Sequence, residues 1–306
     1  MLPRTLGVGG PWLGRQLRDR LTSDGCRALI AMSRYARGRL VKAQQQWPGL
    51  ARVLPKVVIL YPHVYARPAT VRRYTRGEVL RLVFVGNDFA RKGGIVALRA
   101  VARMAAAGLP VHLDVVSAGR IGGSVYTDHP DRGRYAADLK LLEHPAVTMH
   151  GRQPHARAME LLAGAHVQLL ATMDDTFGYS VIEGFSVGTP VLATAVCAMP
   201  ELVPSTAGAL LDLPVDAWGN WVDLPTRNEP GYWERLDFAY IELTDQVVAR
   251  VTELVDDPQR VSPWSEGALA QYRCRFESTA AGARLDDVYD RALRGESPAI
   301  AEAYAD

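Results

Sequence analysis

Several features that would assign this chain to a special class of protein are missing from its 306 residues. There is no uninterrupted apolar run of about 18 residues, so the sequence predicts no membrane-spanning helix. The N-terminus lacks the layout of a signal peptide, because its first apolar stretch is short and broken by glycine and arginine. The three cysteines, Cys26, Cys197 and Cys274, are odd in number and far apart, which matches neither a metal site nor a disulfide framework. These absences indicate a globular protein of the cytoplasm.

Lysine is scarce in this arginine-rich chain, and the basic residues are unevenly distributed. Residues 1–80 contain 15 Lys+Arg and 3 Asp+Glu, whereas the remaining residues contain 20 and 30. The basic segment could dock on anionic lipid as a peripheral membrane contact, could face a phosphorylated acceptor, or could be a solvated helix face. It lacks interleaved exposed aromatic residues and any recognisable binding module, which argues against nucleic acid as a partner. Its main contributors are Arg18, Arg20, Arg34, Arg37, Arg39 and Lys42.

The most informative stretch of the chain runs from residue 173 to residue 202. An apolar run of strand length, residues 166–172, precedes it, and another begins at residue 190. Between them, apolar residues fall at helical spacing, and Asp174, Asp175 and Thr176 are candidate N-caps. This order predicts a strand–loop–helix–strand unit, and such units build parallel sheets.

Two acidic residues flank the predicted start of this helix. Asp175 lies just before it and Glu183 about two turns into it, with seven residues between them. The first amides of a helix carry partial positive charge and can hold a phosphate, and Gly178 lets a ligand approach the backbone closely. This layout suits a nucleotide-sugar, which has hydroxyls at both ends and phosphates in the middle. Alternatively, the two acids only cap the helix and stabilise its dipole.

The pattern resembles the donor-site signature of the retaining GT-B glycosyltransferases of family four. That signature has an acid, seven residues and Glu, with Phe-Gly after the acid and Gly-x-Pro-Val after the Glu. The resemblance implies that Asp175 contacts hydroxyls of the donor sugar and that Glu183 binds the ribose diol. It places the diphosphate on backbone amides of Phe177, Gly178, Tyr179 and Ser180.

The match departs from the family pattern at three places. Asp175 stands where Glu is usual, so the reach of the acid is one methylene shorter. Gly184 replaces a small helix former, at a cost of up to about 1 kcal/mol in helix propensity. Residues 195–198 lack the frequent glycine pair. These departures bear on which sugar is bound more than on the fold.

A second resemblance lies about 80 residues earlier in the chain. Residues 80–86 predict a strand, which leads into a glycine-containing loop and then an amphipathic helix. The loop is not a Walker loop, but it resembles the first donor-domain loop of the family, a glycine followed after a short gap by Lys-Gly. This implies that Gly86 borders the donor and that Lys92 contacts its diphosphate. The family often has arginine directly after the glycine, where this chain has Asn87, so Arg91 is a candidate substitute.

A third donor-side turn follows the predicted strand at residues 147–150. In the family the corresponding turn lies beside the nucleotide base, which makes Gly151 and Arg152 candidates. His150 and His155 have no recognisable metal partners and are expected to be ordinary surface or packing residues.

The remaining predicted elements complete an α/β pattern. Strands are expected at residues 27–33, 56–61, 111–117 and 209–213. Helices are expected at residues 12–21, 34–46, 135–142, 155–164, 239–255, 265–276 and 278–293, and residues 214–236 are expected to be irregular.

The resemblance also implies a division into domains. Residues 1–66 resemble the closing part of an N-terminal acceptor domain, whose remainder would need about 100 more residues. Residues 67–79 are a predicted linker, residues 80–276 a Rossmann-like donor domain, and residues 277–306 a C-terminal helix that crosses back. The expected fold is therefore α/β of GT-B type, a Rossmann-like parallel sheet domain with a partial N-terminal α/β domain.

The function implied by the resemblance is sugar transfer from a nucleotide-diphosphate sugar to an acceptor hydroxyl, with retention. The acceptor could be a glycan, a lipid or a small molecule. Lys92 and Asp175 are the predicted catalytic residues, and Lys92 with the helix-end amides would stabilise the leaving diphosphate. The donor loops carry no Asp-x-Asp motif, so neither a metal nor a cofactor is predicted. Two alternatives stay open: a GT-B epimerase or phosphorylase, and a module that binds nucleotide-sugar without turnover.

Overall fold

The computed structural model describes residues 10–122, 127–296 and 298. The chain forms two compact units. The larger comprises residues 64–277, and the smaller combines the residues before 64 with those after 277. Within the described ranges, no helix combines the length and apolar character needed to cross a membrane.

The larger unit is built on one parallel sheet, in which the strands follow the order β5-β4-β3-β6-β7-β8. All four residues of β6 and of β7 are buried, as expected for strands covered on both faces. The predicted α/β fold with a Rossmann-like sheet is thereby confirmed. The strands are β3 (Leu80–Val85), β4 (Val111–Val116), β5 (Val147–Gly151), β6 (Val167–Leu170), β7 (Val191–Thr194) and β8 (Gly208–Leu211).

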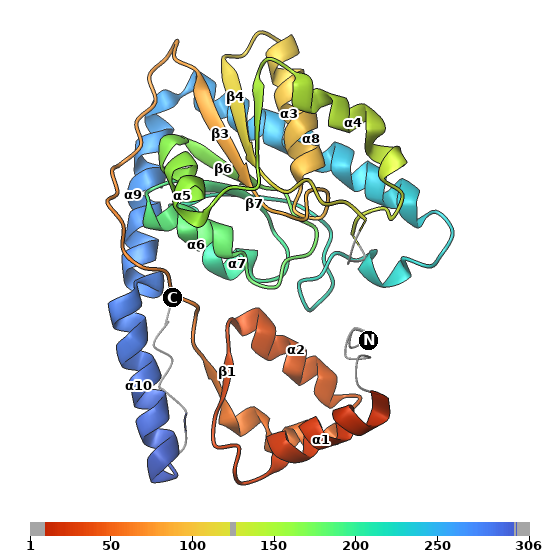
Figure 1. Cartoon of the computed structure of the whole chain (residues 1–306), viewed down its shortest axis with the longest axis vertical. Coiled ribbons are helices and arrows are strands. Elements are labelled where there is room, and N and C mark those ends of the chain that lie inside the picture. Colours follow the sequence, from red (N-terminus) through yellow and green to blue (C-terminus); the bar gives the residue numbers. More distant parts are fainter. Residues whose placement is uncertain (1–9, 123–126, 297, 299–306) are drawn as a thin grey trace. The chain divides into compact units, whose positions relative to one another are not determined.

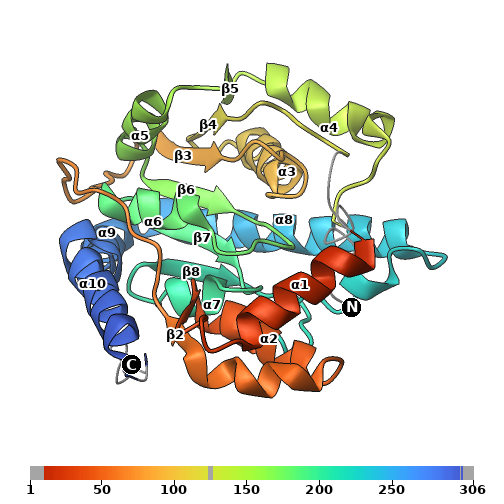
Figure 2. The same cartoon turned by 60° about the horizontal axis from the view of Figure 1, so that its bottom comes forward.

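Helices cover both faces of this sheet. Figures 1 and 2 show α3, α4 and α8 on one face and α5, α6 and α9 on the other. The helix predicted at residues 135–142 is wrong in length, because α4 has only five residues between two short 3-10 turns. The helices are α3 (Gly94–Ala106), α4 (Ala136–Lys140), α5 (His155–Gly164), α6 (Tyr179–Ser186), α7 (Met199–Leu202), α8 (Tyr232–Asp256) and α9 (Val261–Gln271).

The strand order reverses in the middle of the sheet. From β3 the chain moves outward through β4 to β5, and it then returns beside β3 with β6 and moves outward the other way. In open parallel sheets, ligands bind in the crevice beyond the carboxyl ends of the strands at such a reversal. The loops after β3 and β6 are therefore the expected site.

The segment before β3 lies along the larger unit. Val64 pairs in parallel with Glu277, and the backbone N–H of Arg72 donates to Ser265 Oγ at 2.8 Å. The guanidinium of Arg72 also donates to the carbonyl of Val187 at 2.6 Å. These bonds hold Val64 and Arg72 to other parts of the larger unit.

The smaller unit contains a parallel pair of three-residue strands, β1 (Leu29–Ala31) and β2 (Val57–Ile59). The helix between them, α2 (Arg34–Gln44), is capped by Ser33, whose Oγ accepts from the N–H of Ala36 at 2.9 Å. The expectation of a buried strand at residues 27–33 is wrong, because Ile30 is 43% exposed. In the described part of this unit β1 pairs with β2 alone. Two further helices are α1 (Gly10–Thr22) and α10 (Ser278–Arg294).

Candidate functional site

The loops after β3 and β6 meet backbone to backbone. Gly93, in the first loop, has φ of 87°, and a Cβ there would overlap the carbonyl of Ala171 at the end of β6. Only glycine allows both this conformation and this approach. The contact places Lys92 beside Asp175, and Lys92 Nζ forms an ion pair with Asp175 Oδ2. Asp175 is only 5% exposed, so the two predicted catalytic side chains form a largely buried pair.

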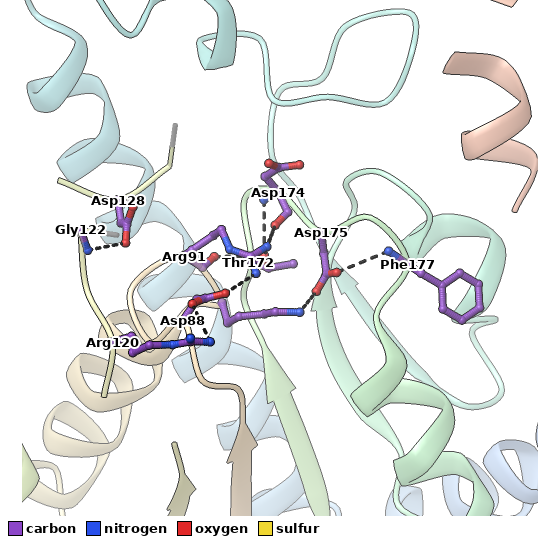
Figure 3. Close-up of polar contacts among 10 residues, drawn as sticks. Asp88, Arg91, Arg120, Gly122, Asp128, Thr172, Asp174, Asp175 and Phe177 are labelled. Carbon is purple, nitrogen blue, oxygen red and sulfur yellow. Dashed lines mark hydrogen bonds and ion pairs between the residues drawn. The ribbon is translucent and has the colours of Figure 1, made fainter. Parts of the chain in front are cut away.

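The start of α6 differs from the prediction. The candidate N-caps at residues 174–176 are wrong: the helix begins at Tyr179, and Gly178 is its N-cap with φ of 91° and no side-chain cap. Asp175 instead accepts from the N–H of Phe177 at 3.4 Å and binds Lys92 (Figure 3). Since the helix starts late, Glu183 lies one turn into it rather than two.

The beginning of α6 offers groups suited to an anion. The amides of Tyr179 and Ser180 belong to the first turn and have no intrahelical acceptor. The Oγ of Ser180 is buried and has no hydrogen-bond partner in the part of the chain that the structure describes. A Cβ on Gly178 would lie 2.5 Å from Cε of Met199, so the backbone approaches its surroundings closely. These groups fit a phosphate, with Lys92 contributing positive charge nearby.

Glu183 is half-buried, and its charge is influenced by three neighbours. Burial raises the pKa of the Glu183 carboxyl, and the positive charges of His155, Arg67 and Lys92 offset part of that rise. His155 Nδ1 lies 3.6 Å from Glu183 Oε1. The sequence interpretation treated His155 as ordinary, although its position at the first turn after β5 was the available signal.

The glycine and asparagine of the β3 loop shape the loop itself. A Cβ on Gly86 would lie 3.2 Å from Cβ of Lys92, so Gly86 leaves room for the lysine. Asn87 Oδ1 accepts from the N–H of Ala118 at 3.2 Å, and its carbonyl accepts from the N–H of Arg120 at 3.1 Å. Asn87 thus joins this loop to the loop after β4.

Arg91 is close to the site, but its guanidinium already has protein partners. One nitrogen donates to the carbonyl of Asp174 at 2.9 Å, and another donates to Asp88 Oδ2 at 2.8 Å. Asp88 was given no role in the sequence interpretation, and Asp174 was considered there only as a candidate N-cap. Their roles depend on contacts between loops that are distant in the chain.

Gly151 is the last residue of β5 and Arg152 follows it, so both lie at the carboxyl end of a strand two positions from β3 in the sheet. Gly151 has φ of 69°, and its carbonyl accepts from the N–H of Ser117 at 3.1 Å. Arg152 is exposed. In the described ranges no three His, Cys, Asp or Glu side chains are grouped to hold a metal ion.

Comparisons of sequence identify relatives of the larger unit. A family model described as "Glycosyl transferases group 1" matches residues 80–219. The D-inositol 3-phosphate glycosyltransferase of Thermobispora bispora is 27% identical over 215 residues, which are 69% of this chain and 43% of the relative. One subunit of the phosphatidylinositol N-acetylglucosaminyltransferase of Arabidopsis thaliana is 29% identical over 142 residues, 45% of this chain and 31% of the relative. The matched region is therefore less than half of each relative.

Solved structures share the fold. Sucrose-phosphate synthase from Thermosynechococcus elongatus has a TM-score of 0.61 at 15% identity, over 88% of this chain and 59% of that one. Alr3699/HepE from Anabaena, solved in complex with UDP-glucose, has a TM-score of 0.57 at 13% identity, over 86% of this chain and 64% of that one. The family match identifies residues 80–219 as a group 1 glycosyltransferase region, and the similar structures show an α/β fold of GT-B type.

Proposed function

We propose that this chain transfers a sugar from a nucleotide-diphosphate sugar to an acceptor hydroxyl, with retention at the anomeric carbon and without a metal ion. The observation that carries the proposal is the grouping at the reversal of the sheet. There the Lys92–Asp175 ion pair lies just before α6, and Glu183 lies one turn inside that helix. Two carboxylates, a lysine and the first amides of a helix are groups that suit such a donor.

Each group has a distinct task in the proposed reaction. The amides of Tyr179 and Ser180, together with Lys92, bind the diphosphate and stabilise its charge as it leaves. Asp175 accepts hydrogen bonds from hydroxyls of the sugar, and Glu183 accepts hydrogen bonds from the two ribose hydroxyls. The Ser180 hydroxyl, which is buried and unpartnered among the described residues, supplies a further donor. Departure of the diphosphate and attack of the acceptor on one face of the sugar give retention.

The acceptor belongs to the same proposal. The two relatives named above act, by their names, on an inositol phosphate and in phosphatidylinositol modification. Inositol phosphate and inositol lipid are therefore the first acceptors to test, ahead of other glycans and small molecules. The basic helices of the smaller unit suit phosphorylated or lipid acceptors of this kind.

A second candidate function is nucleotide-sugar binding without transfer. One observation favours it: the described part of the smaller unit has a sheet of only two short strands, and Ile30 on β1 is exposed. The two candidates differ in product formation, not in donor binding. A calorimetric titration with UDP-glucose, followed by an acceptor assay, separates them.

The donor site is tested by Glu183→Gln. A carboxylate that accepts two ribose hydroxyls makes two charge-assisted hydrogen bonds of roughly 1.5–3 kcal/mol each, and Gln keeps one acceptor. We expect nucleotide affinity, measured by calorimetry with UDP, to fall by roughly tenfold to hundredfold. The melting temperature should stay the same or rise slightly, because Gln has no half-buried charge.

The matched control is Glu160→Gln on α5, a solvent-exposed carboxylate paired with Arg157. It should change neither quantity. Unchanged UDP affinity in Glu183→Gln, together with a clear loss of thermal stability, would assign Glu183 a structural role and remove the basis of the proposal.

A further inference from the structure

Arg91 is held between two loops instead of being open to a ligand. Its Nη1 donates to the carbonyl of Asp174 at 2.9 Å, and its Nη2 donates to Asp88 Oδ2 at 2.8 Å (Figure 3). The side chain is only 15% exposed. A guanidinium in this position connects the loop after β3 with the peptide that directly precedes Asp175.

The backbones of the same two loops are joined at the same place. Thr172 is fully buried, and its hydroxyl lies within donor distance of two carbonyls, 3.0 Å from that of Arg91 and 3.1 Å from that of Asp174. Its Oγ also accepts from the N–H of Asp174 at 3.3 Å. The turn that leads into Asp175 is therefore bound to Arg91 through both main chain and side chain.

The carboxylate that orients Arg91 is itself fixed. Asp88 Oδ1 lies 3.3 Å from Nη2 of Arg120, and Asp88 pairs with Arg120 in an isolated parallel bridge. Burial alone would raise the pKa of Asp88, but the hydrogen bond and charge of Arg91, with the charges of Arg120 and Lys92, bring that pKa below its ordinary value. Asp88 is therefore ionised at neutral pH and holds Arg91 in one orientation.

We propose that Arg91 is a positioning residue, which fixes the Asp174 carbonyl and thereby sets the Asp175 carboxylate for the sugar of the donor. The inference rests on the proposed function and deepens it at the sugar end of the site. It replaces the sequence expectation that Arg91 contacts the diphosphate. Asp175 carries the shorter of the two acidic side chains, so its placement depends strongly on its backbone.

The two roles for Arg91 lead to different binding patterns. If Arg91 bound a phosphate, it would contribute equally to the affinity for a nucleoside diphosphate and to that for a nucleotide-sugar, and lysine would serve in its place. A positioning residue would act only on the sugar-dependent part of the affinity. Lysine would not replace it, because one ammonium group does not reproduce the two-armed contact of guanidinium with Asp88 and Asp174.

The test uses Arg91→Gln, Arg91→Lys and Asp88→Asn in the full chain, titrated with UDP and with UDP-glucose. In all three variants we expect UDP affinity to stay within a factor of about three and UDP-glucose affinity to fall roughly tenfold, the loss of one charge-assisted hydrogen bond. Arg157→Gln is the matched control, because Arg157 on α5 is 52% exposed and pairs with Glu160, outside this group of residues. It should leave both affinities unchanged.

Hydrogen exchange of the ligand-free protein gives a second readout. The amides of residues 174–178 should exchange faster in Arg91→Gln and Asp88→Asn, while the melting temperature shifts little. Equal losses of affinity for UDP and for UDP-glucose, or wild-type affinities in Arg91→Lys, would show that Arg91 binds a phosphate and would overturn the inference. Unchanged exchange at residues 174–178 would also overturn it. Wild-type protein that binds neither UDP nor UDP-glucose would count against the proposed function instead, and the exchange data would still decide the positioning role.

Discussion

Glu183 has an ionisable carboxyl that is half-buried in α6. Burial raises the pKa of its carboxyl above the ordinary value of 4.5, and the charges of His155, Arg67 and Lys92 offset part of the rise. The folded protein therefore binds this proton more tightly than the unfolded chain. As pH rises from 4.5 through the raised pKa, this group lowers the free energy of unfolding, which is the reverse of the effect of an ordinary paired carboxylate.

Nucleotide binding should have the opposite dependence on pH. In the proposed site the ionised form of Glu183 accepts hydrogen bonds from the ribose hydroxyls, so UDP affinity should be constant above the raised pKa and fall below it, by at most about tenfold per pH unit. In His155→Gln the fall should begin at higher pH, because one offsetting charge is lost. In Glu183→Gln this fall should be absent. Calorimetric titrations from acidic to neutral pH measure all three, and identical profiles for wild type and Glu183→Gln would contradict the assignment.

At the scale of single residues, the sequence supplied the residues that are proposed for the donor site but not the contacts between them. Lys92, Asp175 and Glu183 were identified from spacing and resemblance, and the structure places the first two in contact. That pairing is not predictable from local pattern, because it joins loops 83 residues apart. The same holds for Arg91, whose two partners come from different loops.

At the scale of elements, α6 packs closely against β6 where Gly184 faces Gln168. Gly184 is buried in α6, and a Cβ on it would lie 2.5 Å from Oε1 of Gln168 in β6. Gln168 is fully buried, and neither polar atom of its amide has a partner among the described residues. The glycine at this position, a departure from the family pattern, makes room for the large polar residue beneath it.

This fit predicts strong coupling between the two positions. Gly184→Ala alone should destabilise the protein by about 1–3 kcal/mol through overpacking, despite the better helix propensity of alanine. Adding Gln168→Val should restore the loss and raise stability above wild type, since it removes a buried unpaired amide that costs about 1–3 kcal/mol. Urea unfolding of the single and double variants measures the coupling.

Gly164→Ala in α5 is the matched control for this cycle. Nothing lies within 4 Å of a Cβ at that position, so no loss of stability is expected. Additive effects of Gly184→Ala and Gln168→Val would contradict the proposed fit.

The elements themselves were largely predictable, and their ends were not. Buried parallel strands read as short apolar runs, so β3, β4 and β5 lie where the sequence predicted them. The start of α6 was misplaced because residues 174–176 have good capping side chains in isolation. In the folded chain Asp175 binds Lys92, and Gly178, in a left-handed conformation, is the N-cap of the helix that begins at Tyr179. Tertiary contacts decided against the local preference.

At the scale of the whole molecule, charge is distributed unevenly along the chain. Residues 1–80 carry an excess of 12 positive charges, and the rest carries an excess of 10 negative charges. In the smaller unit Arg18 and Arg20 on α1 and Arg37 on α2 are exposed. Arg18 also lies over the ring of Trp47 at 5.3 Å, which combines a cation with an aromatic face. Such helices suit contact with an anionic surface.

We therefore expect the protein to bind vesicles that contain anionic lipid and to bind neutral vesicles poorly. Each basic group near an anionic surface contributes about 1 kcal/mol, and salt screens the attraction over about 10 Å at 0.1 M. Changing Arg18, Arg20 and Arg37 together to Gln should weaken vesicle binding roughly hundredfold in sedimentation at low salt. Changing three exposed arginines of the larger unit, Arg81, Arg157 and Arg273, should have little effect. Equal sedimentation with anionic and neutral vesicles, or equal losses in the two triple variants, would show that these basic helices are only solvated surface.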